Sequence, residues 1–95
     1  MLIHIRIRGR VQGVGFRAWA CRQADDLKLS GWVRNRSDRS VEILAEGTDQ
    51  NINLFLNLCH RGPLFARVDK IDPVSVPDAF VPPIQRGIFI NEATV

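Results

Sequence analysis

The stretch IRGRVQGVGFRAW, residues 7–19, contains three glycines within seven residues, and the hydrophobic pattern changes across it. Before it, residues 2–8 alternate, with Ile3, Ile5 and Ile7 on one face, which predicts a strand with one buried face. After it, residues 16–29 carry apolar side chains at helical spacing, which predicts an amphipathic helix. The stretch is therefore predicted to join a strand to the N-terminus of a helix through a glycine loop.

The rest of the chain extends this pattern to a complete fold. It predicts a hairpin of two strands at 31–35 and 40–47, a helix at 48–62 capped by Thr48 or Asp49, a strand at 66–74 and a short strand at 87–91. The pair Ser30-Gly31 is expected to stop the first helix, and a proline-containing loop should precede the last strand. The order β-α-β-β-α-β predicts an α+β fold, a ferredoxin-like sandwich whose antiparallel sheet has two helices on one face.

Length and composition narrow the class of protein. Ninety-five residues, 45 % of them hydrophobic, predict a single domain over residues 1–95 with one core. No apolar run approaches the ~20 residues of a membrane span, and the N-terminus lacks the apolar core of a signal peptide. Cys21 and Cys59 lie in apolar patterns without a C-x-x-C partner, as expected of core thiols. These features predict a cytoplasmic protein with no membrane association.

The basic residues indicate an anionic ligand. The formal net charge is +3, and eleven of the thirteen basic residues are arginine. Arginine favours planar, two-point contacts with phosphate or carboxylate over simple point-charge attraction. RNA is the other ligand to consider for such a chain.

The glycine loop has the chemistry of a phosphate cradle. Backbone N–H groups at a helix N-terminus lack intrahelical partners, and glycines let them curl around an anion. Arg17 follows in the first helical turn, where it opposes the helix dipole, and that invites a functional explanation. The spacing G-x-x-x-G-x-G matches neither the Walker A loop nor the dinucleotide fingerprint. On the loop alone, a tight turn with a solvated Arg17 remains the better interpretation.

A second element, GWVRN at residues 31–35, ends on Asn35. In the predicted fold the first and second strands end near each other, so Asn35 can face the glycine loop. A carboxamide can hold a water molecule without deprotonating it. An ordinary turn asparagine is the alternative, and spacing alone favours it.

Together, GRVQGVGFR, GWVRN and SVEI resemble the acylphosphatase family, and the resemblance continues through GP and ARV after the second helix. The family consists of small ferredoxin-like enzymes that hydrolyse carboxyl phosphates to a carboxylate and inorganic phosphate without a metal. The resemblance implies that Arg17 makes a bidentate phosphate contact and that Asn35 orients the attacking water. It also implies a phosphate cradle formed by Gly9, Arg10, Val11, Gln12, Gly13, Val14, Gly15 and Phe16 together with Arg17.

Other expectations concern ligands and partners. An acyl phosphate is the expected substrate and inorganic phosphate the expected product and inhibitor, with no cofactor, no nucleic acid and a monomeric state. The residues agree, because the chain offers no nucleophile with its base, no carboxylate pair and no cluster with metal-ligand spacing. One position departs from the family. Arg39 stands where the hairpin turn usually has glycine, so it is expected to adopt a positive φ at some cost.

Two alternatives remain. A phosphate- or RNA-binding module without catalysis needs exposed aromatic side chains on the sheet for base stacking. The chain has no tyrosine, and Trp19 and Phe55 fall on predicted helical core faces. A similar domain of a carbamoyl-transfer maturation protein would be followed by zinc-finger sequences, which this sequence does not contain.

Overall fold

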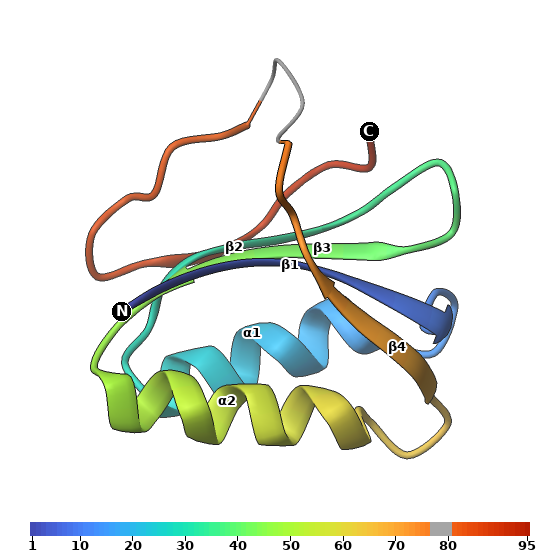
Figure 1. Cartoon of the computed structure of the whole chain (residues 1–95), viewed down its shortest axis with the longest axis horizontal. Helices are drawn as coiled ribbons and strands as arrows, with labels where there is room; N and C mark the ends of the chain where they lie inside the picture. Colours follow the sequence, from blue (N-terminus) through green and yellow to red (C-terminus); the bar gives the residue numbers. More distant parts are fainter. Residues whose placement is uncertain (77–80) are drawn as a thin grey trace.

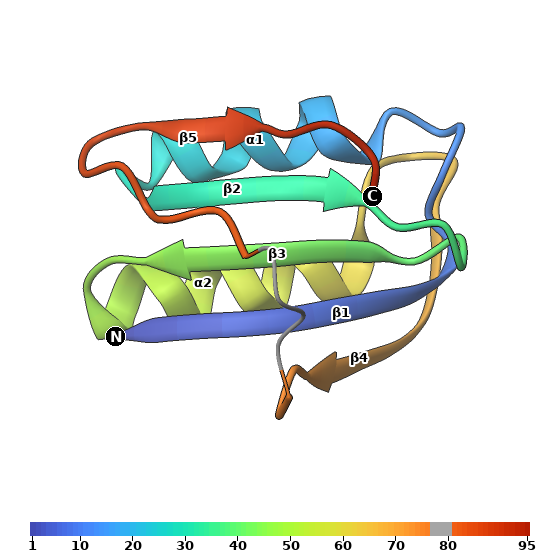
Figure 2. The same ribbon diagram turned by 90° about the horizontal axis from the view of Figure 1, so that it is seen from above.

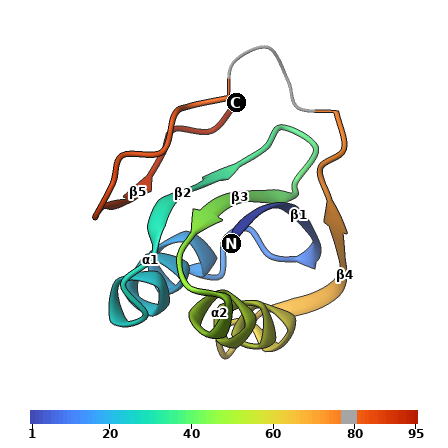
Figure 3. The same ribbon diagram turned by 60° about the vertical axis from the view of Figure 1, so that its left-hand side comes forward.

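The computed structural model describes residues 1–76 and 81–95 and confirms the predicted order of elements. The predicted loop includes residues 77–80, which lie outside the described residues. The elements are β1 (Leu2–Arg10), α1 (Phe16–Asp26), β2 (Ser30–Asn35), β3 (Val41–Glu46), α2 (Asp49–Arg61), β4 (Arg67–Pro73) and β5 (Phe89–Asn91). The two helices lie side by side on one face of a twisted sheet (Figures 1 and 3). In the described residues, no helix is long and apolar enough to cross a membrane.

The sheet has five strands in the order β4-β1-β3-β2-β5. β1 pairs antiparallel with both β3 and β4, and β2 pairs antiparallel with β3. The four strands of the predicted βαββαβ order are therefore antiparallel, as expected, and the additional β5 pairs parallel with β2, which makes the five-stranded sheet mixed (Figure 2). The three-residue β5 is too short to reveal its direction from sequence, because strand direction is set by the path of the preceding loop.

The core forms where the sequence pattern places it, between the sheet and the helices. Ile5 and Ile7 from β1 lie in this layer, and α1 and α2 each add small or aromatic side chains. Thr48 caps α2 by accepting a hydrogen bond from the Asn51 N–H at 3.2 Å, as predicted. The fully buried core residues of β2, β3 and α2 are Val33, Val41, Ile43, Ala45, Ile52, Phe55 and Cys59.

The first helix ends earlier than predicted. It stops at Asp26, and Lys28 adopts a left-handed conformation with φ 56°. The N–H groups of Lys28 and Leu29 donate to Asp25 and Ala24 at 3.1 and 2.9 Å, which is the hydrogen-bond pattern of a Schellman end. Lysine thus takes the position that glycine usually fills, and Ser30-Gly31 already belongs to β2.

The opposite face of the sheet is also covered. The chain after residue 80 runs along this face before it enters β5 (Figures 1 and 3). Trp32 is fully buried there, and its Nε1 donates to the Pro82 carbonyl at 2.8 Å. Arg34 and Glu42 are buried on the same face. Glu42 is enclosed there by hydrogen bonds with His4, Arg34 and Arg36.

Gly9 lies within β1, at a register shift in its pairing with β4. A Cβ on Gly9 would lie 2.2 Å from the Arg67 carbonyl oxygen. Gly9 therefore permits close approach of two strand backbones, and β1 continues to Arg10 before the loop begins.

Candidate active site

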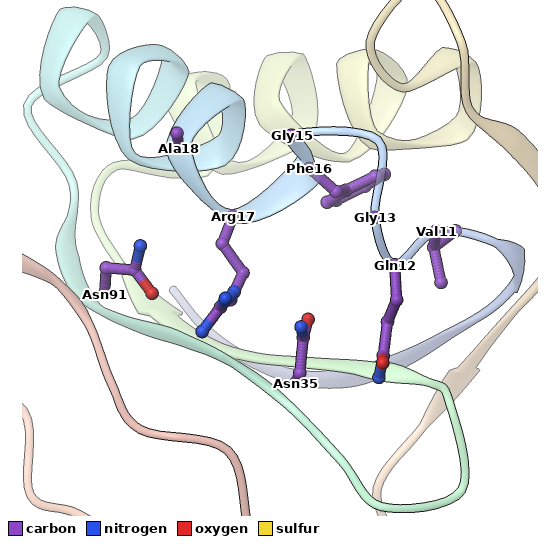
Figure 4. A pocket seen from close by; sticks show the side chains of 9 residues that line it. All are labelled: Val11, Gln12, Gly13, Gly15, Phe16, Arg17, Ala18, Asn35 and Asn91. Atoms are coloured by element: carbon purple, nitrogen blue, oxygen red, sulfur yellow. The ribbon is translucent and has the colours of Figure 1, made fainter.

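A cavity of about 200 Å³ lies where the glycine loop, the start of α1 and the ends of β2 and β5 meet (Figure 4). Arg17 enters it from the helix and Asn35 from the strand below. It is lined by Val11, Gln12, Gly13, Gly15, Phe16, Arg17, Ala18, Asn35 and Asn91. The cavity thus brings together the glycine loop and the second motif, although Arg17 and Asn35 are eighteen residues apart in the sequence.

The loop approaches α1 through two left-handed glycines. Gly13 has φ 73° and Gly15 has φ 77°, and neither would bring a Cβ within 4 Å of another atom. These glycines are required by backbone conformation and not by crowding. Gly15 is the N-cap of α1; it provides no side-chain cap, and the first turn contains no acidic residue. The N–H groups of that turn are therefore left for a ligand, and the helix dipole favours an anion there.

Arg17 projects from this turn across the cavity (Figure 4). Its side chain is half-buried and forms no ion pair with any residue that the structure describes. A guanidinium held beside unpaired N–H groups offers a flat, two-point contact to phosphate oxygens.

Asn35 is the last residue of β2, and its carboxamide points toward the cavity (Figure 4). Its Oδ1 is buried and has no hydrogen-bond partner within the described residues. A buried acceptor without a partner is costly unless a water or ligand fills the role. Its backbone is fixed independently, because the Val95 N–H donates to the Asn35 carbonyl at 3.1 Å.

The residues on either side of Asn35 are anchored to one carboxylate. Arg34 Nε and an Arg36 guanidinium nitrogen donate to Glu42 Oε1 at 2.7 and 3.0 Å, and His4 Nε2 lies 2.6 Å from Oε2. Burial by itself would raise the pKa of Glu42, but hydrogen bonds from Arg34 and His4 and the nearby arginine charges hold that pKa below its usual value. The ionised carboxylate thus fixes the strand end that carries Asn35.

Gln12 ties the glycine loop to the β2–β3 hairpin. Its Nε2 donates to the carbonyl oxygens of Arg36 and Ser40, both at 2.9 Å. The side chain of Gln12 is therefore used to hold the loop, and any contact of Gln12 with a phosphate would come from its backbone N–H.

The hairpin turn has the strained geometry expected from its sequence. Arg39 has φ 74°, as predicted for a position where glycine is usual. Asp38 supports the turn by accepting from the Ser40 N–H at 3.0 Å and from the Ser40 hydroxyl. The other carboxylate oxygen of Asp38 accepts from Arg6 and Arg8, both at 3.1 Å.

The structure brings most of the predicted site residues together. Arg17, Asn35 and five of the predicted cradle residues, Val11, Gln12, Gly13, Gly15 and Phe16, line the cavity. Gly9, Arg10 and Val14 do not line it, because the first two lie in β1 and Val14 packs against the core. Asn91 was missed by sequence reasoning. Its signal was weak, since only the parallel pairing of Val33 with Asn91 brings this residue to the cavity.

Known proteins resemble this chain in sequence and in overall fold. Residues 3–79 match the model of the acylphosphatase family. An acylphosphatase of Synechococcus sp. (strain RCC307) is 57 % identical over 70 % of this chain, and the match spans 57 % of that protein's length. An acylphosphatase of Methylococcus capsulatus is 49 % identical over 74 % of this chain and 76 % of its own. The crystal structure of acylphosphatase from Bacillus subtilis superposes with a TM-score of 0.81 and 37 % identity, over 97 % of this chain and 99 % of its own.

Proposed function

Since this chain belongs to the acylphosphatase family of enzymes, we propose that Arg17, Asn35 and the N–H groups of the glycine loop form its catalytic site for acyl phosphates. The observation that carries the proposal is that one cavity holds the Oδ1 of Asn35 and the guanidinium of Arg17, neither of which has a hydrogen-bonding or ion-pair partner among residues 1–76 and 81–95. One group can bind the phosphoryl oxygens and the other can accept a hydrogen bond from water.

In this mechanism the N–H groups at residues 13–16 and the Arg17 guanidinium bind the three terminal oxygens of the phosphoryl group. Asn35 holds a water molecule in line with the bond from phosphorus to the carboxylate oxygen. The water oxygen attacks phosphorus, that bond breaks, and the carboxylate leaves with the bonding electron pair. The cradle stabilises the charge that spreads over the phosphoryl oxygens as the bond loosens.

The proton of the attacking water needs an acceptor. None of the residues that line the cavity is a carboxylate, imidazole or thiol, so we propose that the proton passes to a phosphate oxygen of the substrate. An acyl phosphate suits this site because its carboxylate is a good leaving group that needs no general acid. The same lining residues lack the usual metal ligands, and this supports hydrolysis that is independent of a metal.

The remaining features of the proposal concern the protein as a whole. We propose that residues 1–95 act as one domain, because the sheet and both helices share one hydrophobic core, and that they act as a monomer. The free thiols of Cys21 and Cys59 fit a cytoplasmic location. We expect no role in RNA binding, because Trp32 on the sheet is fully buried and offers no surface for base stacking.

Phosphate release from benzoyl phosphate in the presence of EDTA tests the activity. We expect turnover to continue, with inorganic phosphate as a competitive inhibitor. Activity that disappears with EDTA and returns with zinc or magnesium would contradict the proposal.

A further inference from the structure

A second hollow, of about 420 Å³, adjoins the proposed catalytic cavity. The two hollows share Val11, Gln12 and Gly13 as common walls. The second one is completed by Gly9, Arg10 and Arg39. A ligand whose phosphate lies in the glycine loop can therefore extend past Gly13 into a space flanked by two arginines.

Arg39 is not neutralised by any acidic side chain that the structure describes. It is exposed and forms no ion pair within the described residues, although Asp38 is its neighbour in sequence. Both oxygens of Asp38 are already engaged, one by Ser40 and the other by Arg6 and Arg8. Arg39 also sits at φ 74°, a conformation that an arginine adopts only at a cost. Strained residues of this kind cluster at functional sites.

Arg10 is in a comparable position. It lies directly opposite Arg67 in the antiparallel pairing of β1 with β4, and like charges in such a pair are destabilising. Arg67 is compensated by Asp69, with Nε and Oδ1 3.0 Å apart. No acidic side chain in the described part of the chain pairs with Arg10. Two guanidinium groups thus flank one hollow. The backbone of Arg39 is strained, and Arg10 is repelled by the like charge of Arg67.

We propose that this hollow is an anion subsite for the acyl part of the substrate. The preferred acyl phosphates then carry a second anionic group, a carboxylate or a phosphate, at the end of the acyl chain remote from the reacting phosphoryl group. Arg39 and Arg10 bind that second group. This inference rests on the proposed function, because it assumes that the phosphoryl group occupies the glycine loop.

The test compares three substrates of similar shape: para-carboxybenzoyl, para-phosphonobenzoyl and para-carbamoylbenzoyl phosphate. The first two are anionic at the remote end, and the carbamoyl compound is a neutral isostere of the carboxyl compound. The readout is the ratio of kcat/KM for each anionic substrate to that for the carbamoyl substrate. A ratio cancels any general effect of a substitution on folding or on the catalytic step.

In the unmodified protein we expect both ratios to exceed one and to fall as salt is raised. Arg39→Gln should lower the preferred ratio by about three- to fivefold, as for a single exposed ion pair. Arg10→Gln combined with Arg39→Gln should abolish the preference. Arg22→Gln removes a charge from the exposed face of α1 and should leave the ratios unchanged. The larger of the two ratios identifies whether carboxylate or phosphate is the better group.

Ratios near one in the unmodified protein, or equal ratios in the protein and the double variant, would overturn the inference while leaving the proposed function intact. Absence of turnover with all three substrates would instead contradict the proposed function. In that case the subsite is tested by the dissociation constants of para-carboxybenzylphosphonate and para-carbamoylbenzylphosphonate, measured by calorimetry. Equal constants for the two phosphonates would then refute the subsite.

Discussion

Arg34 donates from its buried Nε to Glu42 Oε1 across 2.7 Å, and this contact fixes the strand end from which Asn35 enters the cavity. Glu42 is only 1 % exposed and also receives hydrogen bonds from Arg36 and His4. Removal of the carboxylate charge from such a buried network is strongly destabilising. Glu42 therefore couples the stability of the sheet to the position of the proposed water-binding side chain.

Glu42→Gln should destabilise the protein by about 3 kcal/mol, since two arginines would lose their common anion. Urea denaturation at neutral pH measures the effect. Glu46→Gln is the matched control, because Glu46 is the exposed glutamate at the end of the same strand. If both variants lost the same amount, the buried network would have no special role.

Arg17→Ala should weaken phosphate inhibition and lower kcat/KM together, because the guanidinium binds the phosphoryl group before and during the reaction. Arg17→Lys should not restore either value, since an ammonium cannot make the two-point contact. Steady-state kinetics with benzoyl phosphate provides both measurements. Arg22→Ala, on the exposed side of the same helix, serves as the control for lost charge. Rescue by lysine would show that Arg17 acts as a simple point charge.

Asn35→Ala should lower kcat by roughly 100-fold, as is typical when a transition-state contact is lost. The inhibition constant of inorganic phosphate should stay nearly the same, because Asn35 is proposed to bind water and not the phosphoryl group. Asn57→Ala, exposed on α2, is the control. The assignment is wrong if the variant loses phosphate affinity and keeps its kcat.

Arg39→Gly should raise the free energy of unfolding by at most ~1 kcal/mol, because glycine adopts φ 74° without the strain of a Cβ. Arg39→Ala removes the same side chain but keeps the Cβ, so it should not produce the gain. Denaturant melts of the two variants separate the backbone effect from the loss of charge. A clear loss of stability in the glycine variant would mean that the arginine side chain itself supports the turn.

Asp38→Asn should destabilise the hairpin by about 1 kcal/mol or less at neutral pH, since the carboxylate is partly exposed. The hydrogen bond from the Ser40 hydroxyl, opposed by partial burial and aided by the Ser40 N–H, Arg8 and Arg6, holds the pKa of Asp38 below its usual range. A depressed pKa contributes stability above the ordinary carboxyl pKa and loses it as the pH falls toward the folded-state value. The difference between the two proteins should therefore be full at pH 7 and shrink below about pH 4. Urea melts across this pH range test it, and a difference independent of pH would contradict the ionic role.

The glycine loop could be predicted from sequence because its signals are local, whereas the roles of Arg17 and Asn35 came only from the resemblance to the acylphosphatase family. The switch from period two to helical spacing locates the loop, and the glycines at 13 and 15 do adopt the left-handed conformations that such a loop requires. Gly9 was predicted to belong to the phosphate cradle, but it lies in β1 and does not line the cavity. Glycine is needed there because the backbones of β1 and β4 approach closely, and sequence alone does not distinguish this role from that of a cradle residue.

The remaining features depend on contacts that sequence patterns do not encode. The end of α1 was misplaced because Lys28, a residue with a Cβ, adopts the left-handed conformation. The position of Asn91 and the contact over Trp32 both depend on the course of the chain after residue 80, which brings β5 parallel to β2 and the Pro82 carbonyl to the Trp32 indole. A short strand after an irregular loop carries too little periodicity to predict either.

Trp32 provides a fluorescence probe of the sheet face that lies opposite the helices. Its indole is fully buried and donates to the Pro82 carbonyl, so its emission reports on the same C-terminal segment that carries Asn91 to the cavity. The only other tryptophan is Trp19, which packs on Phe16 of α1 with ring centroids 5.2 Å apart. In a Trp19→Phe variant, Trp32 is the single tryptophan, and it lies where the C-terminal segment contacts the sheet. If the C-terminal segment detaches from the sheet, the emission maximum of Trp32 should shift to longer wavelength even while the helices stay folded. The segment that carries Asn91 to the cavity can therefore be followed in solution without any added dye.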